Sequence, residues 1–292
     1  METIIGKDRK WMTDKKTLAY MLVFLIGVSI MLYPSISNMW NRHVFKTQVS
    51  SYEDKVSSGA VDMDKEPENA ELYNKNLSPK EVPDAFSVKD GSTDENYENV
   101  LNIGADGMMG YISIPSINVE IPIYHYTDEE TLKKGAGHLL GSSLPVGGKG
   151  THAVISAHRG LPSAKMFSDL NLLEKGDAFY IYVLDKKMKY KVDRIAVVEP
   201  DETESLAIEE GKDLVTLVTC TPYGVNTHRL LVRGHRVSND TAVQETVKID
   251  FTKIITTLLC ILAGIALAYL IYKLFDRKRG EKWKLGKLLK KH

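Results

Sequence analysis

Residues 214–237 read LVTLVTCTPYGVNTHRLLVRGHRV, and this stretch contains two apolar, β-branched runs on either side of a turn. Runs of this composition that are bounded by proline and glycine are typical of β-strands. We therefore expect a hairpin in which Cys220 stands at the end of the first strand and Arg229 at the beginning of the second. Such a hairpin brings the thiol and the guanidinium close together.

Five further runs of similar composition precede the hairpin. They lie at residues 111–114, 119–124, 152–157, 178–184 and 189–198. At least seven short strands between turn residues predict a mostly β domain, built as an antiparallel sandwich or barrel. Thr127 and Glu130 form a capping-box pattern, which predicts a short helix that ends near Gly135.

The composition excludes several classes of function. Lys and Arg together number 38, as do Asp and Glu, and a zero net charge argues against a nucleic-acid binder. The sequence has no glycine-rich loop for a phosphate and no His/Cys grouping with the spacing of a zinc site. We therefore expect no cofactor and no metal.

Two long apolar runs, at residues 17–34 and 254–273, are each long enough to cross a bilayer. Basic residues lie at the outer end of each run, so the positive-inside rule puts both termini in the cytoplasm and everything between the runs outside the cell. The first run is alternatively a cleaved signal peptide, although no A-x-A site follows it. Neither run carries a buried charge, which argues against transport.

The chain has two cysteines, Cys220 and Cys260, and they cannot pair because Cys260 lies in the second apolar run. A free thiol outside the cell is either an inert buried residue or a reactive one. Only about 3% of an unperturbed thiol is ionised at neutral pH, so a nucleophilic cysteine needs a histidine or a positive charge nearby.

His158 is the best candidate for that histidine, because it ends the strand THAVISA and enters the turn HRGLP. Arg229 is a fixed donor that could stabilise the oxyanion formed when Cys220 attacks a carbonyl. Each residue also has an ordinary structural interpretation: a core cysteine, a surface turn histidine and an arginine paired with an acid. The pattern alone therefore indicates a possible cysteine acyl-transfer site and leaves these alternatives open.

Three longer motifs resemble those of class C sortases, the pilin-polymerising cysteine transpeptidases of Gram-positive bacteria. These are TCTPYGVNTHRLLVRGHR, GHLLGSSLPVGGKGTHAVISAHRGLPSAKMFSDLNLLEKGDAFY and IPSINVEIPIYHYTDEETLKKGAGH, within residues 110–237. The trailing apolar run is also a trait of that class. The resemblance implies an eight-stranded sortase β-barrel and makes His158, Cys220 and Arg229 its catalytic residues.

The implied reaction has two steps and takes place at the membrane. Cys220 attacks the threonine carbonyl of an LPxTG-like sorting signal to form a thioacyl-enzyme, while His158 protonates the leaving glycine amine. A lysine amine of another pilin then resolves the intermediate, with His158 as the base. The implied partners are pilin or surface-protein subunits with such a signal, and no nucleic acid.

Class C sortases also resemble one another in a lid with an Asp-Pro-aromatic motif. Residues 83–86 read PDAF, so Asp84 and Phe86 match the motif while Ala85 replaces the usual proline. By this resemblance Asp84 would pair with Arg229 and Phe86 would cover the Cys220 sulfur. The segment is otherwise interpreted as a disordered acidic linker.

The resulting domain plan has eight parts. They are a cytoplasmic tail (1–16), a transmembrane signal-anchor or uncleaved signal (17–34), a helical region (35–77), the lid segment (78–105), the catalytic barrel (106–238), a linker (239–253), a second transmembrane helix (254–273) and a basic cytoplasmic tail (274–292). Three alternatives remain: a sortase that anchors proteins to peptidoglycan, a cysteine protease, whose papain and caspase signatures are absent, and a non-enzymatic membrane-tethered β-domain.

Overall fold

The computed structural model describes residues 15–59, 61–77, 82–87 and 94–240, and near the C-terminus 255–256, 258–262, 264–266 and 273. The chain divides into two compact units, Met1–Lys248 and Ile249–His292. In the second unit the described residues are helical, but most of the expected linker, second span and basic tail lies outside the described residues. The second span therefore stays a prediction.

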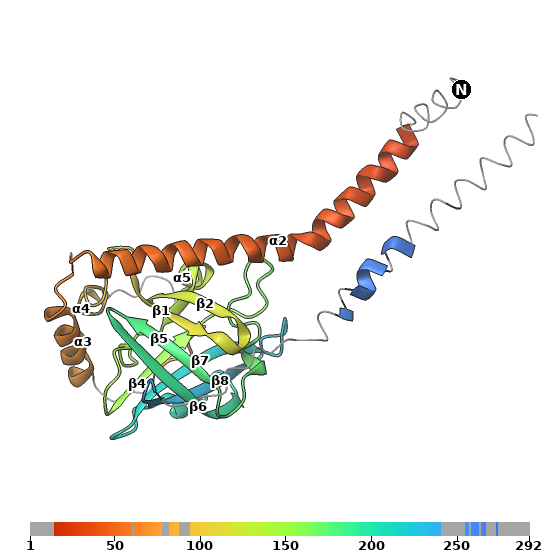
Figure 1. Cartoon of the computed structure of the whole chain (residues 1–292). Helices are drawn as coiled ribbons and strands as arrows, with labels where there is room; N and C mark the ends of the chain where they lie inside the picture. The colour runs from red at the N-terminus through yellow and green to blue at the C-terminus, as the bar shows by residue number, and fades with distance from the viewer. Residues whose placement is uncertain are drawn as a thin grey trace, which may run out of the picture. The chain divides into compact units, whose positions relative to one another are not determined.

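Eight strands form a closed barrel in the order β1-β2-β3-β4-β7-β8-β6-β5 (Figure 1). They are β1 (Met108–Ile114), β2 (Val119–His125), β3 (Ala136–His138), β4 (Thr151–Ser156), β5 (Ala178–Val183), β6 (Lys186–Val198), β7 (Asp213–Thr221) and β8 (His228–Val237). The expectation of a mostly β, eight-stranded barrel is confirmed. The first unit of the chain is thus built around one closed sheet.

The strand β3 was not recognised in the sequence. It has only three residues, and it pairs parallel with β2 and antiparallel with β4. Its central residue is a glycine because a Cβ at Gly137 would collide with the carbonyl oxygen of Tyr126. This short strand closes the barrel between two longer ones.

The helices surround the barrel and are mostly short. They are α2 (Lys15–Ser57), α3 (Lys65–Asn76), α4 (Glu95–Glu98) and α5 (Glu129–Lys134), with 3₁₀ turns η1 (Pro115–Ile117), η2 (Leu170–Leu172) and η3 (Glu204–Leu206). The helix expected before Gly135 is α5, but its N-cap is Asp128, whose carboxylate accepts the Thr131 N–H at 3.0 Å. Thr127 is buried in the turn before it. The predicted capping box was therefore wrong by one residue.

The helix α2 has two halves with different surroundings. In its second half Phe45, Val49 and Tyr52 are buried on one face, against the barrel. The Tyr52 hydroxyl donates to the Met109 carbonyl at 3.0 Å and accepts the Leu184 N–H at 2.8 Å, which ties α2 to β1 and to the end of β5. This half of α2 is part of the folded domain.

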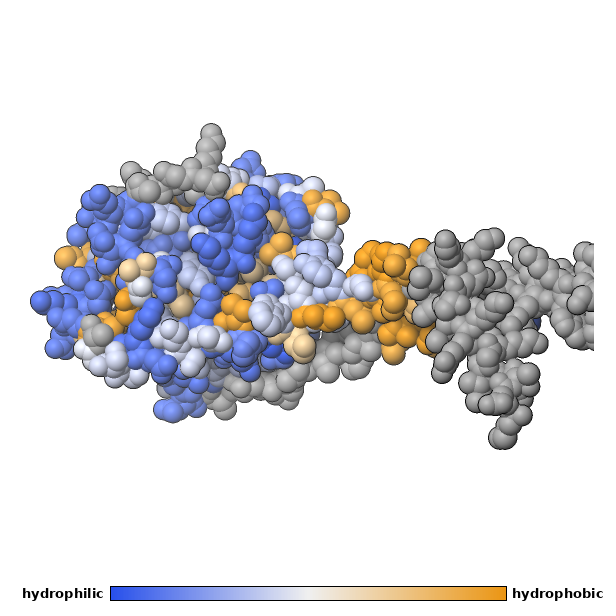
Figure 2. Space-filling model, turned by 90° about the horizontal axis from the view of Figure 1, so that it is seen from above, coloured by the Kyte–Doolittle hydropathy of each residue, from blue (hydrophilic) through white to orange (hydrophobic). Residues whose placement is uncertain are grey.

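The first half of α2 presents large apolar side chains to the outside, seen as the hydrophobic surface where the helix leaves the barrel (Figure 2). By length and composition α2 is the one described helix that could cross a membrane. The helix continues through Pro34 without a break. The expected N-terminal apolar helix is thus present, as part of one long helix that reaches the barrel.

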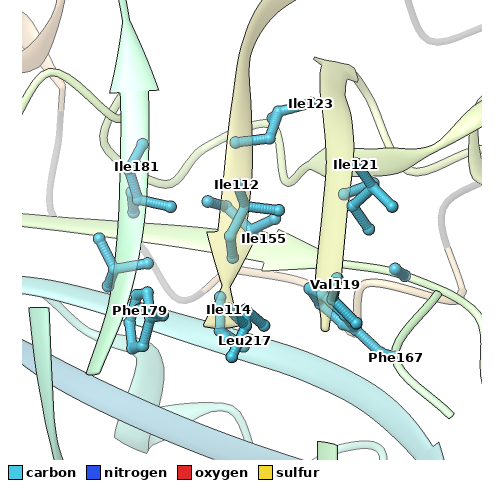
Figure 3. Close-up of a cluster of buried hydrophobic side chains, with 14 of the residues drawn as sticks. Ile112, Ile114, Val119, Ile121, Ile123, Ile155, Phe167, Phe179, Ile181 and Leu217 are labelled. Carbon is cyan, nitrogen blue, oxygen red and sulfur yellow. The ribbon is translucent and has the colours of Figure 1, made fainter. Parts of the chain in front are cut away.

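The core fills the inside of the barrel. Figure 3 shows isoleucines of β1, β2, β4 and β5 pointing toward one another, together with Phe167, Phe179 and Leu217. Ile155 of β4 and Leu217 of β7 are both fully buried there. Since side chains alternate along a strand, the neighbours of Ile155 and Leu217 point to the outer face of the barrel wall.

Candidate active site

The strands β4, β7 and β8 lie side by side and carry the three residues that the sequence singles out (Figure 1). β4 and β7 are parallel. Two hydrogen bonds extend their contact past the end of β4, because the Ala157 N–H donates to the Val218 carbonyl at 3.2 Å and the Thr219 hydroxyl donates to the Ala157 carbonyl at 2.7 Å. His158 therefore follows this strand end beside Cys220.

Arg229 stands directly opposite Cys220 in the antiparallel register of β7 and β8. Residues 222–227 connect the two strands, so the hairpin expected from the sequence is present. Residues directly opposite each other on an antiparallel pair point to the same face of the sheet. Cys220 and Arg229 thus occupy paired positions on two adjacent strands, and His158 follows the end of the third.

These side chains belong to the outer face of the barrel wall. Val154 of β4 and Val218 of β7 form a hydrophobic cluster that is separate from the barrel core. His158 and Cys220 lie an even number of residues from Val154 and Val218, so they share the outer face with that cluster. The ends of their two strands lie side by side, because β4 and β7 are neighbours in the barrel.

The lid residue Asp84 forms a two-point ion pair with Arg229. The Nε and Nη2 atoms of Arg229 each donate to one carboxylate oxygen of Asp84 at 2.7 Å. The side chains of Arg229 and Asp84 are only 11% and 8% exposed, so water screens this pair weakly. Its planar fork geometry fixes the lid in orientation as well as in place.

The rest of the described lid, residues 82–87, packs on the same face. Val82 and Ala85 are buried in the cluster that contains Val154 and Val218. The ring of Phe86 lies with its centroid 6.0 Å from that of His158 and 5.2 Å from the Arg229 Cζ. The lid therefore contacts His158 and Arg229 directly. That Phe86 covers the sulfur of Cys220 stays a prediction.

The lid also affects the ionisation of the thiol. Burial raises the pKa of Cys220, the charge of Arg229 opposes this, and the carboxylate of Asp84 raises the pKa further. Burial lowers the pKa of His158, against the attraction of Glu129 and with a smaller contribution from Lys133. In this arrangement both shifts favour the neutral forms, the thiol of Cys220 and the uncharged imidazole of His158.

Arg159 is a residue of this site that sequence reasoning missed. Its Nη1 donates to the Thr221 hydroxyl at 2.8 Å, next to Cys220, and its Nη2 donates to Asn171 Oδ1 at 2.9 Å. Its guanidinium carbon also lies 5.9 Å from the ring centroid of Tyr223. The feature of the sequence that could have identified Arg159 is its position directly after His158, in the same turn.

A groove of about 740 Å³ is lined by residues of α3, by Val82 and Pro83 of the lid segment, and by Gly141. None of the three site residues lines it. Among the residues that the structure describes, no group of three or more His, Cys, Asp or Glu side chains could hold a metal ion.

Comparison with known proteins identifies close relatives of this arrangement. The family profile described as Sortase domain matches residues 112–237. The structure of sortase C-1 from Actinomyces oris is 52% identical, with a TM-score of 0.57, and the match covers 60% of this chain and 98% of that one.

Two further relatives agree with this result. For sortase C of Streptococcus pneumoniae, studied for its catalysis and pilin substrate specificity, the identity is 44%, the TM-score 0.61 and the coverage 66% of this chain and 97% of that one. A curated sortase A from Bacillus anthracis is 32% identical over 155 residues, which are 53% of this chain and 67% of the relative. Fold and sequence thus point to the same family.

Proposed function

The chain belongs to the sortase family of cysteine transpeptidases, and we propose that it polymerises pilins at the cell surface through His158, Cys220 and Arg229. The observation that carries this proposal is the placement of Arg229 directly opposite Cys220, with His158 at the end of the neighbouring strand. Similarity to class C sortases of Actinomyces and Streptococcus supports the choice of pilins as substrates.

Catalysis begins when the lid leaves. While Asp84 occupies the Nε and one Nη2 donor of Arg229, those two donors are not available to a substrate oxygen. Departure of Asp84 frees those donors and removes a negative charge that raises the pKa of Cys220. The thiol proton then passes to His158, which gives a thiolate and an imidazolium.

The first chemical step transfers the acyl group to the enzyme. The Cys220 sulfur attacks the threonine carbonyl carbon of an LPxTG-like signal, and the carbonyl oxygen becomes an oxyanion that Arg229 stabilises. The threonine–glycine C–N bond breaks as His158 gives its proton to the leaving amine. A thioester between Cys220 and threonine remains.

The second step joins two subunits. The lysine amine of another pilin attacks the thioester carbon and gives a proton to His158, and the C–S bond breaks. The products are an isopeptide bond between lysine and threonine and a Cys220 thiolate, which regains its proton from His158. Neither step requires a cofactor.

The proposed location is the outer surface of the cell membrane. The apolar first half of α2 serves as the anchor, and residues 254–273 serve as a second span. Basic residues outside both runs place the termini in the cytoplasm and the barrel outside. The enzyme then meets pilins that leave the membrane on the same side.

Mass spectrometry of the reaction products tests this function. The purified enzyme is incubated with a pilin that carries a C-terminal LPxTG-like signal, with the variant Cys220→Ala as control. A lysine–threonine isopeptide bond that forms with the wild type and not with the variant supports the proposal. Hydrolysis alone would indicate a protease, and transfer only to a peptidoglycan amine would indicate an anchoring sortase; either result contradicts polymerisation.

A further inference from the structure

The loop that begins at His158 is held at its far end by the helix α2. The Asn41 Nδ2 donates to the Ser163 carbonyl at 2.8 Å, and the Ser37 hydroxyl donates to the same carbonyl at 3.0 Å. The Lys165 N–H donates to Asn38 Oδ1 at 3.0 Å. Three side chains of α2 thus satisfy backbone groups of a segment more than 120 residues away in sequence.

The same loop is closed at its base. The Phe167 N–H donates to the His158 carbonyl at 3.2 Å, so residues 158–167 form a closed loop with His158 at its neck. Phe167 is fully buried in the barrel core, and Arg159 connects the neck to Thr221. The barrel therefore contacts this neck from one side, and α2 holds residues 163–165, which lead directly into its Phe167 half.

The loop has little regular structure to hold it in place. Residues 158–165 form bends and irregular backbone, and Lys165 is the last of them before the turn that leads to η2. The Lys165 ammonium donates to the Ile117 carbonyl at 2.9 Å and pairs with Asp169 at 2.7 Å. An irregular segment depends on such side-chain contacts for its order, since each fixed residue costs conformational entropy.

The residues of α2 that contact the loop lie near the boundary between the two halves of the helix. Ser37, Asn38 and Asn41 are only partly exposed and lie at the end of the exposed apolar half of the helix, where Met39 and Trp40 are still exposed. The buried residue Phe45 continues the same face one turn further on. The helix therefore contacts the His158 loop at the point where it leaves the apolar stretch.

We propose that Ser37, Asn38 and Asn41 are positioning residues through which the anchor helix holds the His158 loop in its catalytic geometry. This inference builds on the proposed function only in assigning catalysis to His158. The anchor helix is then part of the catalytic unit and not simply a tether. Removing these contacts leaves the nucleophile and the arginine in place but loosens the histidine.

Hydrogen exchange of the full-length protein in lipid nanodiscs tests the contact itself. The variant Asn38→Leu removes the acceptor of the Lys165 N–H at similar volume, and Ser37→Ala with Asn41→Ala removes both donors to Ser163. We expect exchange at the amides of Lys165 and Phe167 to accelerate about fivefold or more, the effect of losing one ordinary hydrogen bond. Asn38→Asp keeps an acceptor and should restore protection of Lys165.

Steady-state kinetics of the same proteins test the consequence for catalysis. With a sorting-signal peptide and an amine acceptor, Asn38→Leu should lower kcat about tenfold while KM stays the same, because misplacing the proton-transfer group affects the reacting geometry and not binding. Thr47→Ala is the matched control, since the exposed Thr47 hydroxyl donates to the His43 carbonyl of its own helix at 3.0 Å.

The two assays separate this inference from the proposed function. Unchanged exchange in Asn38→Leu and in the double variant would overturn the contact, whatever the enzyme does. Faster exchange with unchanged kcat would overturn the positioning role, as would an equal loss of kcat in Thr47→Ala. If the wild-type enzyme forms no product, the proposed function fails, and exchange at Lys165 and Phe167 still decides whether α2 holds the loop.

Discussion

At the scale of single residues, the main feature of the site is the two-point ion pair between Asp84 and Arg229. Arg229 is expected to stabilise an oxyanion, but here two of its N–H groups donate to the carboxylate of Asp84. The same carboxylate opposes ionisation of Cys220. One aspartate thus occupies donors of the proposed oxyanion-stabilising arginine and also raises the pKa of the proposed nucleophile.

The variant Asp84→Ala should make Cys220 more reactive. Loss of the carboxylate lowers the pKa of the thiol, because Asp84 raises it while Arg229 lowers it. A fall of one pKa unit increases the thiolate fraction about tenfold at neutral pH. The rate of alkylation by iodoacetamide, followed against pH, should therefore shift toward lower pH. An unshifted profile would show that Asp84 does not control the thiol.

The variant Phe86→Ala should also speed alkylation of Cys220, for a steric reason. The Phe86 ring lies against His158 and Arg229, and its removal opens the face of the site without changing any charge. We expect a higher rate at every pH with little displacement of the profile. Leu72→Ala, on the exposed surface of α3, is the control. Equal rates in wild type and Phe86→Ala would remove Phe86 from the lid.

At the scale of elements, the short strand β3 contains a buried histidine with a structural role. The Tyr97 hydroxyl lies 2.7 Å from His138 Nδ1, and the Ser143 carbonyl lies 2.8 Å from Nε2. This arrangement suits a neutral ring that accepts from Tyr97 and donates to Ser143. Complete burial lowers the pKa of His138 to about 4.

His138 should therefore make the fold sensitive to acid. The unfolded chain binds a proton on this histidine near its ordinary pKa of 6.5, whereas the folded chain binds it only near pH 4. The unfolded state binds more protons between these values, so the free energy of unfolding falls as the pH decreases, by roughly 3 kcal/mol in all. Chemical denaturation of wild type and His138→Gln from pH 7 to 4 measures it.

The comparison variant separates this residue from the other titrating groups. His138→Gln keeps polar atoms in the pocket but has no titrating group, so its stability should depend less steeply on pH across the same window. An identical slope in the two proteins would mean that other groups cause the acid sensitivity.

Local elements were predicted from the sequence more successfully than the contacts between distant ones. The β7–β8 hairpin depends on residues 214–237 alone, and both its strands and the Cys220–Arg229 pairing were expected. The parallel pairing of β4 with β7 joins strands about 60 residues apart, so no local pattern specifies it. The sequence therefore indicated His158 as the partner of Cys220, but not the parallel pairing of β4 with β7 that brings the two strand ends together.

Two shorter elements are not evident from the local sequence, for identifiable reasons. The strand β3 has three residues with a central glycine, which is too short for alternation to be visible. The stretch 163–173 has a helical composition but forms turns and η2, because contacts with α2 and the core override its intrinsic preference. Tertiary contacts of this kind are not recorded in local sequence.

At the scale of the whole molecule, the chain combines a sortase barrel with a long helix whose first half is apolar and exposed. The helix α2 runs from an exposed apolar half directly into the barrel's side, where it also contacts the His158 loop. The apolar run was recognisable from its composition. Its continuity with the folded domain was not, since the predicted plan divided this part of the chain into a span (17–34) and a separate helical region (35–77).

The expected topology can be tested in intact cells. With both termini in the cytoplasm, an epitope tag after residue 292 should resist external protease while the barrel is digested or released. Permeabilised cells are the control, in which the tag should be lost. Digestion of the tag in intact cells would contradict the second span and the position of the C-terminus.

The proposed mechanism requires that the sulfur of Cys220 carries the acyl fragment of the substrate. Intact-protein mass spectrometry after a brief reaction with an LPxTG-like peptide, without an amine acceptor, tests this most directly. We predict a mass increase equal to the acyl fragment that ends in threonine, located on Cys220 by fragmentation and absent in Cys220→Ala. An acyl group on another residue, or product release by a protein in which Cys220 never carries the fragment, would contradict it.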